Sequence, residues 1–196
     1  MQRNIVWLAI WCLISLQLGG CAAAVVGGAA AGGALIAHDR RTSGTVAQDQ
    51  QTELSAYQLL NEHPEIRDRS HISVTSYNLR VLLTGETESA DLARRFASLV
   101  SQLPHVQSVY NEVIEGASAT IWDESEDTYI TSKVKVALFD VNIEGFDPTA
   151  VKVVTARDNV YLMGLLTREE ARAVVNRVRT VSGVDKVVEV FEYTDG

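Results

Sequence analysis

Apolar and polar positions divide the chain into an apolar N-terminal stretch, a polar stretch and two alternating units. Residues 5–16 and 22–37 carry no charged side chain, whereas residues 38–51 are mostly polar. From Thr52 onwards, runs in which every second residue is apolar alternate with runs in which apolar residues recur every three or four positions. The first pattern is typical of half-buried β-strands and the second of amphipathic helices. An α+β fold is therefore predicted after a linker that ends at residue 51.

The two alternating units are copies of one pattern. Apolar runs of the first unit recur about 79 residues later in the same order, which is typical of a duplicated module. The matching segments are ISVTS (72–76) with VKVVT (151–155), VLLTG (81–85) with VYLMG (160–164), and VQSV (106–109) with VDKV (184–187). Two related domains are therefore predicted, one over residues 52–117 and one over residues 118–196.

Each unit is predicted to begin with an amphipathic helix. In the first unit Leu54, Tyr57 and Leu60 recur at helical spacing and are expected to form the buried face. In the second unit the same spacing selects four residues: Ile130, Val134, Ala137 and Val141.

The rest of each unit is predicted to be an antiparallel hairpin, a second helix and a last strand. Gly85 and Gly164 are expected to end the return strands, because the chain leaves the sheet there. The expected segments are tight turns at 77–78 and 157–159, second helices over 89–103 and 168–181, and last strands over 106–114 and 184–193. A helix between two strands favours a right-handed parallel crossover. Each unit is thus expected to be α-β-β-α-β, with a three-stranded mixed sheet packed on two helices.

This order, with its V-x-L-x-G hairpin strand and GV-x-x-V last strand, resembles the BON domain, a small bacterial periplasmic module linked to phospholipid surfaces. The second unit carries further matching residues: Asp127-Thr128, Thr131, Lys133-Val134, Met163-Gly164-Leu165 and Val181-Ser182-Gly183-Val184. The resemblance covers both units and implies two tandem BON domains.

The N-terminal residues 1–20 are interpreted as a lipoprotein signal peptide. Arg3 supplies a positive charge before the apolar run 5–16, and Leu18-Gly19-Gly20-Cys21 resembles the bacterial lipobox. Cys21 is therefore the predicted lipidation site, where acyl chains such as palmitate would contribute about 0.8 kcal/mol per buried CH₂. Ala22 follows the cysteine, where an aspartate would favour inner-membrane retention in proteobacterial lipoproteins. We therefore expect attachment to the outer membrane, facing the periplasm.

Residues 22–37 leave a second interpretation open. Residues 5–37 could form one transmembrane segment, and Gly28 and Gly32 have the spacing of a GxxxG packing pair. The uncharged tract is mostly Ala and Gly, however, and is shorter than the roughly 20 residues that span a bilayer. We favour a lipidated tether and polar linker over residues 21–51.

Composition excludes several classes of function. Cleavage before Cys21 removes Arg3 and no acidic residue, so the formal charge of −8 becomes −9. This acidity argues against nucleic-acid binding, which needs a basic face. Cys12 is also removed, so no disulfide and no cysteine-based metal site is expected. The four histidines have no metal-binding spacing: His38, His63, His71 and His105.

No catalytic motif is present. A G-x-S-x-G elbow and a P-loop are both missing, so no catalytic residue, cofactor or metal is expected and the protein is predicted not to be an enzyme. The acidic run at residues 123–127 could suggest calcium. It lacks alternating oxygen ligands and a loop glycine, so we favour an acidic helix N-terminus.

The first helix of the second unit carries a second apolar face. At 100° per residue, Tyr129, Val136 and Phe139 lie away from the core positions, with Lys133 and Lys135 on either side. Apolar side chains between lysines suit a membrane interface. Packing of Val136 and Phe139 under a loop or against the other unit agrees equally well with the sequence.

The resemblance to BON proteins favours lipid. It implies that the second domain binds anionic phospholipid, such as phosphatidylglycerol or cardiolipin, through this helix. The resemblance also implies that an aromatic side chain near the start of the helix inserts at the interface, and Tyr129 stands where the family has a tryptophan. Tyrosine buries less apolar area, but Trp122 could add to it. The candidate lipid-binding residues are Trp122, Tyr129, Lys133, Lys135, Val136 and Phe139. The first helix of the first unit carries Glu53 and Glu62 and no lysine, so it is not expected to bind lipid.

Two functions therefore remain open. The first is an outer-membrane lipoprotein that binds anionic lipid and supports membrane integrity, in the family at division sites. The second is a periplasmic interaction module that recruits envelope assembly machinery or regulators of peptidoglycan amidases, with exposed strand edges as docking sites.

Overall fold

The computed structural model describes residues 39–117 and 119–195, and the chain divides into the units Met1–Asp39 and Arg40–Gly196. The predicted signal peptide, the predicted lipidation site Cys21 and the apolar part of the predicted tether lie outside the described residues. Within the described residues, no helix combines the length and the apolar character needed to cross a membrane.

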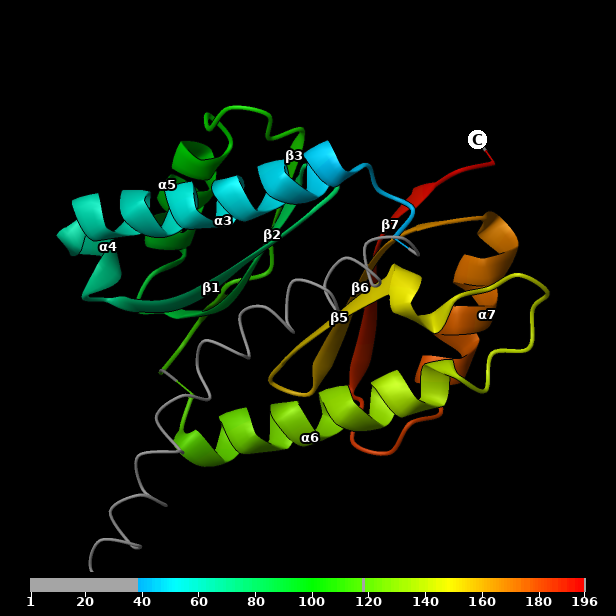
Figure 1. Ribbon diagram of the computed structural model, residues 1–196. Coiled ribbons are helices and arrows are strands. Elements are labelled where there is room, and N and C mark those ends of the chain that lie inside the picture. Colours follow the sequence, from blue (N-terminus) through cyan, green and yellow to red (C-terminus); the bar gives the residue numbers. More distant parts are fainter. Residues whose placement is uncertain (1–38, 118, 196) are drawn as a thin grey trace, which may run out of the picture. The chain divides into compact units, whose positions relative to one another are not determined.

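The first domain contains the five helices and strands of the predicted order, with two short additions, α4 and β4 (Figure 1). Its elements are α3 (Ser43–Glu62), α4 (Pro64–Arg67), β1 (Ser70–Tyr77), β2 (Arg80–Thr87), α5 (Ala90–Val100), β3 (Ser108–Asn111) and β4 (Ile114–Glu115). β1 pairs antiparallel with β2, and β3 and β4 both pair parallel with β2. The last strand, predicted as continuous over 106–114, is therefore interrupted at Glu112 and Val113.

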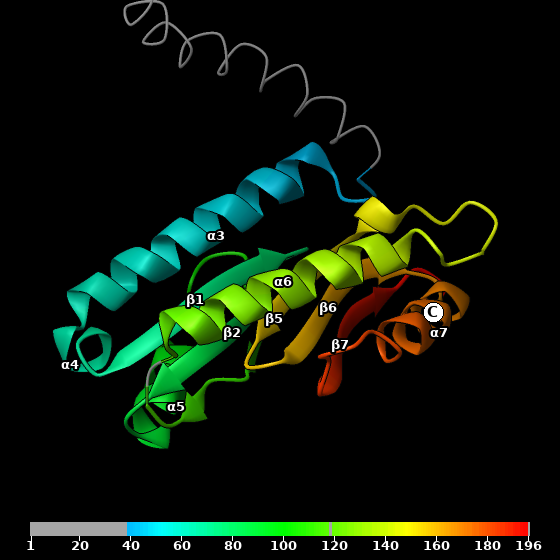
Figure 2. The same ribbon diagram turned by 90° about the horizontal axis from the view of Figure 1, so that it is seen from below.

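The second domain repeats this arrangement. Its elements are α6 (Ile121–Leu138), the 3₁₀ turn η1 (Pro148–Ala150), β5 (Val151–Ala156), β6 (Asn159–Leu166), α7 (Arg168–Val178) and β7 (Lys186–Tyr193). β6 lies between antiparallel β5 and parallel β7. Figure 2 shows α6 alongside β5 and α7 alongside β7. The α+β fold with two α-β-β-α-β domains is confirmed.

One face of each sheet packs on its two helices. In the second domain Ile130, Val134 and Ala137 are buried and Val141 packs against the core, as predicted. The buried face predicted for α3 was correct for Leu60 and wrong for the other two residues, because Leu54 is 60% and Tyr57 40% exposed. Its buried residues are instead Asp49, Thr52, Ala56 and Leu60. These also recur at helical spacing, but two of them are polar and so escape a search for apolar residues.

From Ser43 onwards, the polar segment before Thr52 belongs to this helix and is not a linker. α3 begins at Ser43, with Thr42 as its N-cap, whose Oγ1 accepts a hydrogen bond from the Thr45 amide at 3.1 Å. Asp49 is 2% exposed. Its carboxylate accepts hydrogen bonds from the amides of Asn78 and Leu79 at 2.7 and 2.8 Å and from the Ser76 hydroxyl at 2.8 Å. The polar residue Asp49 in this segment is therefore required to accept the hydrogen bonds of the β1–β2 turn.

The second domain uses the same device. The Asp127 carboxylate accepts hydrogen bonds from the amides of Arg157 and Asp158, both at 2.9 Å. Both central residues of this turn have positive φ angles, 50° and 61°, and those of the β1–β2 turn have 50° and 66°. This backbone is that of the tight hairpin turn whose twist matches paired strands. An aspartate from the first helix therefore stabilises an unfavourable turn in each domain.

The two repeat glycines lie within their strands and do not end them. β2 continues to Thr87 and β6 to Leu166. Gly85 has a φ of 109°, and a Cβ there would come within 1.9 Å of the His71 carbonyl oxygen. At Gly164 a Cβ would lie 2.9 Å from the Ala150 carbonyl oxygen. Both glycines are needed because the neighbouring backbone approaches closely.

The other faces of the two sheets share a third hydrophobic cluster. Its buried members are Tyr77, Leu82, Tyr161, Met163 and Val190. The Tyr77 hydroxyl donates to the Ala150 carbonyl oxygen at 3.1 Å, and burial raises the pKa of Tyr161 to about 12. The central strands β2 and β6 are thus buried on both faces, which explains their unbroken apolar runs.

Candidate functional site

Helix α6 is fixed at its start by a capping box. Thr120 Oγ1 accepts a hydrogen bond from the Asp123 amide at 3.3 Å, and Asp123 Oδ2 accepts one from the Thr120 amide at 2.7 Å. This backbone hydrogen bond lowers the pKa of Asp123. With Asp127 bound to the β5–β6 turn, the acidic run caps a helix and a hairpin. Residues 39–117 and 119–195 contain no group of three His, Cys, Asp or Glu residues that could hold a metal ion.

One side of α6 is an exposed apolar stripe. The α6 stripe comprises Ile121 (80% exposed), Trp122 (84%), Tyr129 (64%), Val136 (70%) and Phe139 (72%). Since an α-helix rises 1.5 Å per residue, the stripe extends for roughly 25 Å. Nine large hydrophobic side chains are exposed among the described residues, and five of them lie in this stripe. Large apolar groups are therefore concentrated on one helix.

The stripe decides the alternative that the sequence left open for Val136 and Phe139. Both side chains are exposed, so neither packs under a loop or against the first domain. Ile121 was not predicted as part of this surface. The sequence could have indicated it, because Ile121 is an apolar residue directly after Thr120, the N-cap of the helix.

The two lysines of α6 have different surroundings. Lys133 is half-buried, and its Nζ donates to the Ser182 carbonyl oxygen and lies 4.5 Å from the centroid of the Tyr129 ring. Lys135 is exposed. Lys133 therefore ties α6 to the loop after α7 and lies against a ring of the stripe, whereas Lys135 borders the stripe from solvent.

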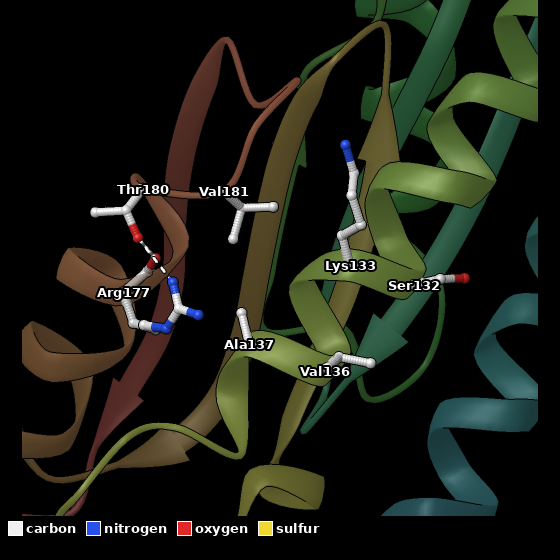
Figure 3. Close-up of a pocket in the computed structure, with 7 residues that line it drawn as sticks. All are labelled: Ser132, Lys133, Val136, Ala137, Arg177, Thr180 and Val181. Atoms are coloured by element: carbon white, nitrogen blue, oxygen red, sulfur yellow. Dashed lines mark hydrogen bonds between the residues drawn. The ribbon is translucent and has the colours of Figure 1, made fainter.

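A groove between α6 and the end of α7 adjoins the stripe (Figure 3). This α6–α7 groove has a volume of about 430 Å³. Its lining residues are Ser132, Lys133, Val136, Ala137, Arg177, Thr180 and Val181. Arg177 and Thr180 were missed by the sequence analysis, because their proximity to Lys133 depends on how the two helices pack.

Helix α3 of the first domain presents no comparable surface. It has two exposed large hydrophobic residues, Leu54 and Tyr57, and the Tyr57 hydroxyl accepts a hydrogen bond from the Val74 amide of β1 at 3.1 Å. Glu53 Oε1 accepts another from the Ser76 amide at 2.8 Å. Tyr57 and Glu53 therefore occupy the outer edge of β1 from Val74 to Ser76. Docking of a partner strand at this edge, which the sequence left open, is therefore not supported.

The sequence profile of the BON domain matches residues 48–116 and 126–195. Outer membrane lipoprotein DolP of Haemophilus influenzae is 33% identical over 189 residues, which cover 96% of each chain. The 21 kDa hemolysin of Actinobacillus pleuropneumoniae is 31% identical over 155 residues, or 79% of each chain. Among solved structures, CdsD, a structural protein of the type III secretion system of Chlamydia trachomatis, aligns with a TM-score of 0.28 and 14% identity over 68% of this chain and 91% of its own. From the two profile matches and the DolP alignment, the chain belongs to the BON domain family, as a DolP-like protein with two BON domains.

Proposed function

We propose that this protein is a non-enzymatic outer-membrane lipoprotein, anchored through acylated Cys21 and facing the periplasm. Its second BON domain binds anionic phospholipid through the α6 stripe and so supports outer-membrane integrity at division sites. The similarity to the outer membrane lipoprotein DolP of Haemophilus influenzae supports the location and the lipid anchor. The α6 stripe carries the proposal for lipid binding, since contiguous exposed apolar surface marks sites of membrane or protein contact.

The composition of the stripe suits a membrane interface. Trp122 and Tyr129 combine an apolar ring with a polar group, which is the character of side chains at headgroup level. Lys133 and Lys135 lie beside them and can meet lipid phosphates. A helix of this kind lies in the plane of the membrane and buries one face.

The overall acidity of the protein makes the anchor important. Anionic lipid repels a cleaved chain with a formal charge of −9, so attraction must come from the local lysines. A tether to the same membrane gives effective concentrations on the order of millimolar. A weak contact of α6 is therefore sufficient once Cys21 carries its acyl chains.

Binding of the untethered domain to vesicles tests the proposal. Residues 40–196 form one compact unit that contains all three hydrophobic clusters, and Trp122 is its only tryptophan. We expect a chain starting at Arg40 to bind vesicles with phosphatidylglycerol or cardiolipin, and not pure phosphatidylcholine. Co-sedimentation and a blue shift of Trp122 emission measure the binding.

Tyr129→Glu is the decisive variant. Loss of the ring from the interface and the added negative charge each contribute about 1 kcal/mol, together about a thirtyfold loss of affinity. Leu54→Glu makes the same kind of change at a 60% exposed position of the first domain and should bind like the unchanged chain. Equal binding to neutral and anionic vesicles, or equal losses in both variants, would refute the proposal.

A further inference from the structure

We propose that the α6–α7 groove holds the phosphodiester of a single anionic phospholipid, with Arg177 as the residue that recognises the phosphate. The inference rests on the proposed function and specifies it. The stripe would supply apolar contact with the membrane, and the groove would supply the preference for an anionic headgroup.

The lining of the groove has the amphipathic character of a phospholipid near its glycerol. Lys133 from α6 and Arg177 from α7 provide two cations, while Ala137 and Val181 provide apolar surface between them. Figure 3 shows the side chains of Arg177, Val181 and Ala137 around the same space, with Lys133 rising from the facing helix. Val136 lines the groove and also belongs to the stripe, so the groove opens beside the surface that would meet the membrane.

The guanidinium of Arg177 is already oriented. Its Nη1 donates to Thr180 Oγ1 at 2.8 Å and its Nη2 to Asp140 Oδ2 at 2.7 Å. The Thr180 hydroxyl in turn donates to the Arg177 carbonyl oxygen at 2.7 Å. A guanidinium has five N–H donors, so further donors remain for a phosphate oxygen.

Asp140 occupies the place of an anion on Arg177. Its side chain is 64% exposed, whereas that of Arg177 is 34% exposed. An exposed ion pair contributes little free energy, so the carboxylate can turn into solvent when a phosphate takes its place. The exchange replaces one anion by another that fits the guanidinium through two parallel hydrogen bonds.

Charge and apolarity together favour a lipid over a free anion. Lys133 and Arg177 outweigh Asp140 by one positive charge, which matches the single charge of a phosphodiester. Lys133 uses one of its three N–H donors on the Ser182 carbonyl oxygen and keeps two. Inorganic phosphate would gain nothing from the apolar lining, whereas the glycerol and first methylenes of a lipid would be partly buried there.

Two substitutions with opposite expected effects test the inference in the chain from Arg40. Arg177→Gln should weaken binding to phosphatidylglycerol vesicles about fivefold, the loss of one cation at a membrane surface. Asp140→Asn should strengthen it severalfold, because the competing carboxylate is lost. Arg172→Gln is the matched control, since Arg172 is exposed on the same helix but does not line the groove. We expect it to stay within twofold of the unchanged chain.

A soluble competitor separates the two sources of phosphate. Dihexanoylphosphatidylglycerol below its micelle concentration should compete with vesicles and shift the Arg177 Nε resonance, and inorganic phosphate at equal concentration should do neither. Thermal melts confirm that each variant is folded. Equal losses for Arg177→Gln and Arg172→Gln would show generic charge attraction and overturn the groove, as would equal competition by inorganic phosphate. If the unchanged chain binds no anionic vesicle even at about millimolar lipid, the effective concentration that the tether supplies, the proposed function fails and the groove fails with it. Anionic binding that none of the three substitutions alters refutes the groove alone.

Discussion

Asp49 provides the sharpest test of how the first domain is held together. If the polar residues before Thr52 formed a linker, Asp49→Ala would be neutral. In the structure this carboxylate accepts two amides of the β1–β2 turn and the Ser76 hydroxyl, and it pairs with Arg41 at 2.8 Å. The substitution would leave two donors of a strained turn without their acceptor.

The size of the effect follows from those contacts. A net hydrogen bond contributes about 1 kcal/mol, and a donor left without a partner costs about 1–3 kcal/mol. Asp49→Ala should therefore lower the free energy of unfolding by about 3 kcal/mol. In a domain pair of this size, 1 kcal/mol corresponds to roughly 2–4 °C, so the midpoint of thermal unfolding should fall by about 6–12 °C.

Urea denaturation followed by circular dichroism measures this loss. Asp127→Ala is the matched variant, because Asp127 accepts the two equivalent amides in the second domain but is less buried. It should lose about 2 kcal/mol. A loss below about 1 kcal/mol for Asp49→Ala, with Asp127→Ala behaving as expected, would refute the assigned role of Asp49.

Two further predictions concern the ion pair at α7 and the repeat glycine. Arg40 binds both oxygens of Glu170, at 2.6 and 2.7 Å, and this hydrogen bonding lowers the pKa of the carboxyl group. A carboxyl group whose pKa is lower in the folded than in the unfolded state stabilises the fold at pH values above the unfolded-state pKa. This stabilisation is lost as the pH falls through the folded-state pKa. Arg40→Met should therefore lower the free energy of unfolding by about 1–3 kcal/mol at pH 7. In urea denaturation at several pH values, the difference in this free energy between the variant and the unchanged chain should begin to shrink near pH 4.5 and vanish below the folded-state pKa of Glu170. A difference independent of pH would contradict this role. Gly85→Ala should lower the free energy of unfolding by more than about 3 kcal/mol, because the added Cβ would overlap the His71 carbonyl oxygen. Gly116→Ala, which has open space around it, should be neutral in the same assay. Equal stability of the two variants would rule out the close approach at Gly85.

Much of the fold was predictable because its signals are local. Alternation with a period of two and helical spacing of three to four located most strands and helices, and the duplication supported each assignment with its copy. The buried face of α6 was correct for the same reason: Ile130, Val134 and Ala137 are apolar and evenly spaced. The start and most of the buried face of α3 were predicted wrongly because its contact with the sheet is partly polar, through Asp49 and Thr52.

The candidate site was predictable only on the helix that carries most of it. Tyr129, Val136 and Phe139 could be placed away from the core from helical geometry alone, and Trp122 was a candidate as the aromatic residue upstream of them. All four are exposed. Whether they bind lipid is still a prediction. The groove was out of reach, since the approach of Arg177 to α6 depends on contacts between segments about 40 residues apart.

The duplicated α+β modules, their parallel crossovers and the second apolar face of α6 could be inferred from the order of residues alone, because backbone periodicity and burial within one segment set these features. Three features became visible only in the folded chain: the two sheets share a cluster through Leu82 and Met163, Lys133 binds the loop after α7, and a groove lies beside the stripe. These features depend on which side chains meet across distant segments. Such contacts follow from packing in three dimensions and leave no periodic trace along the chain.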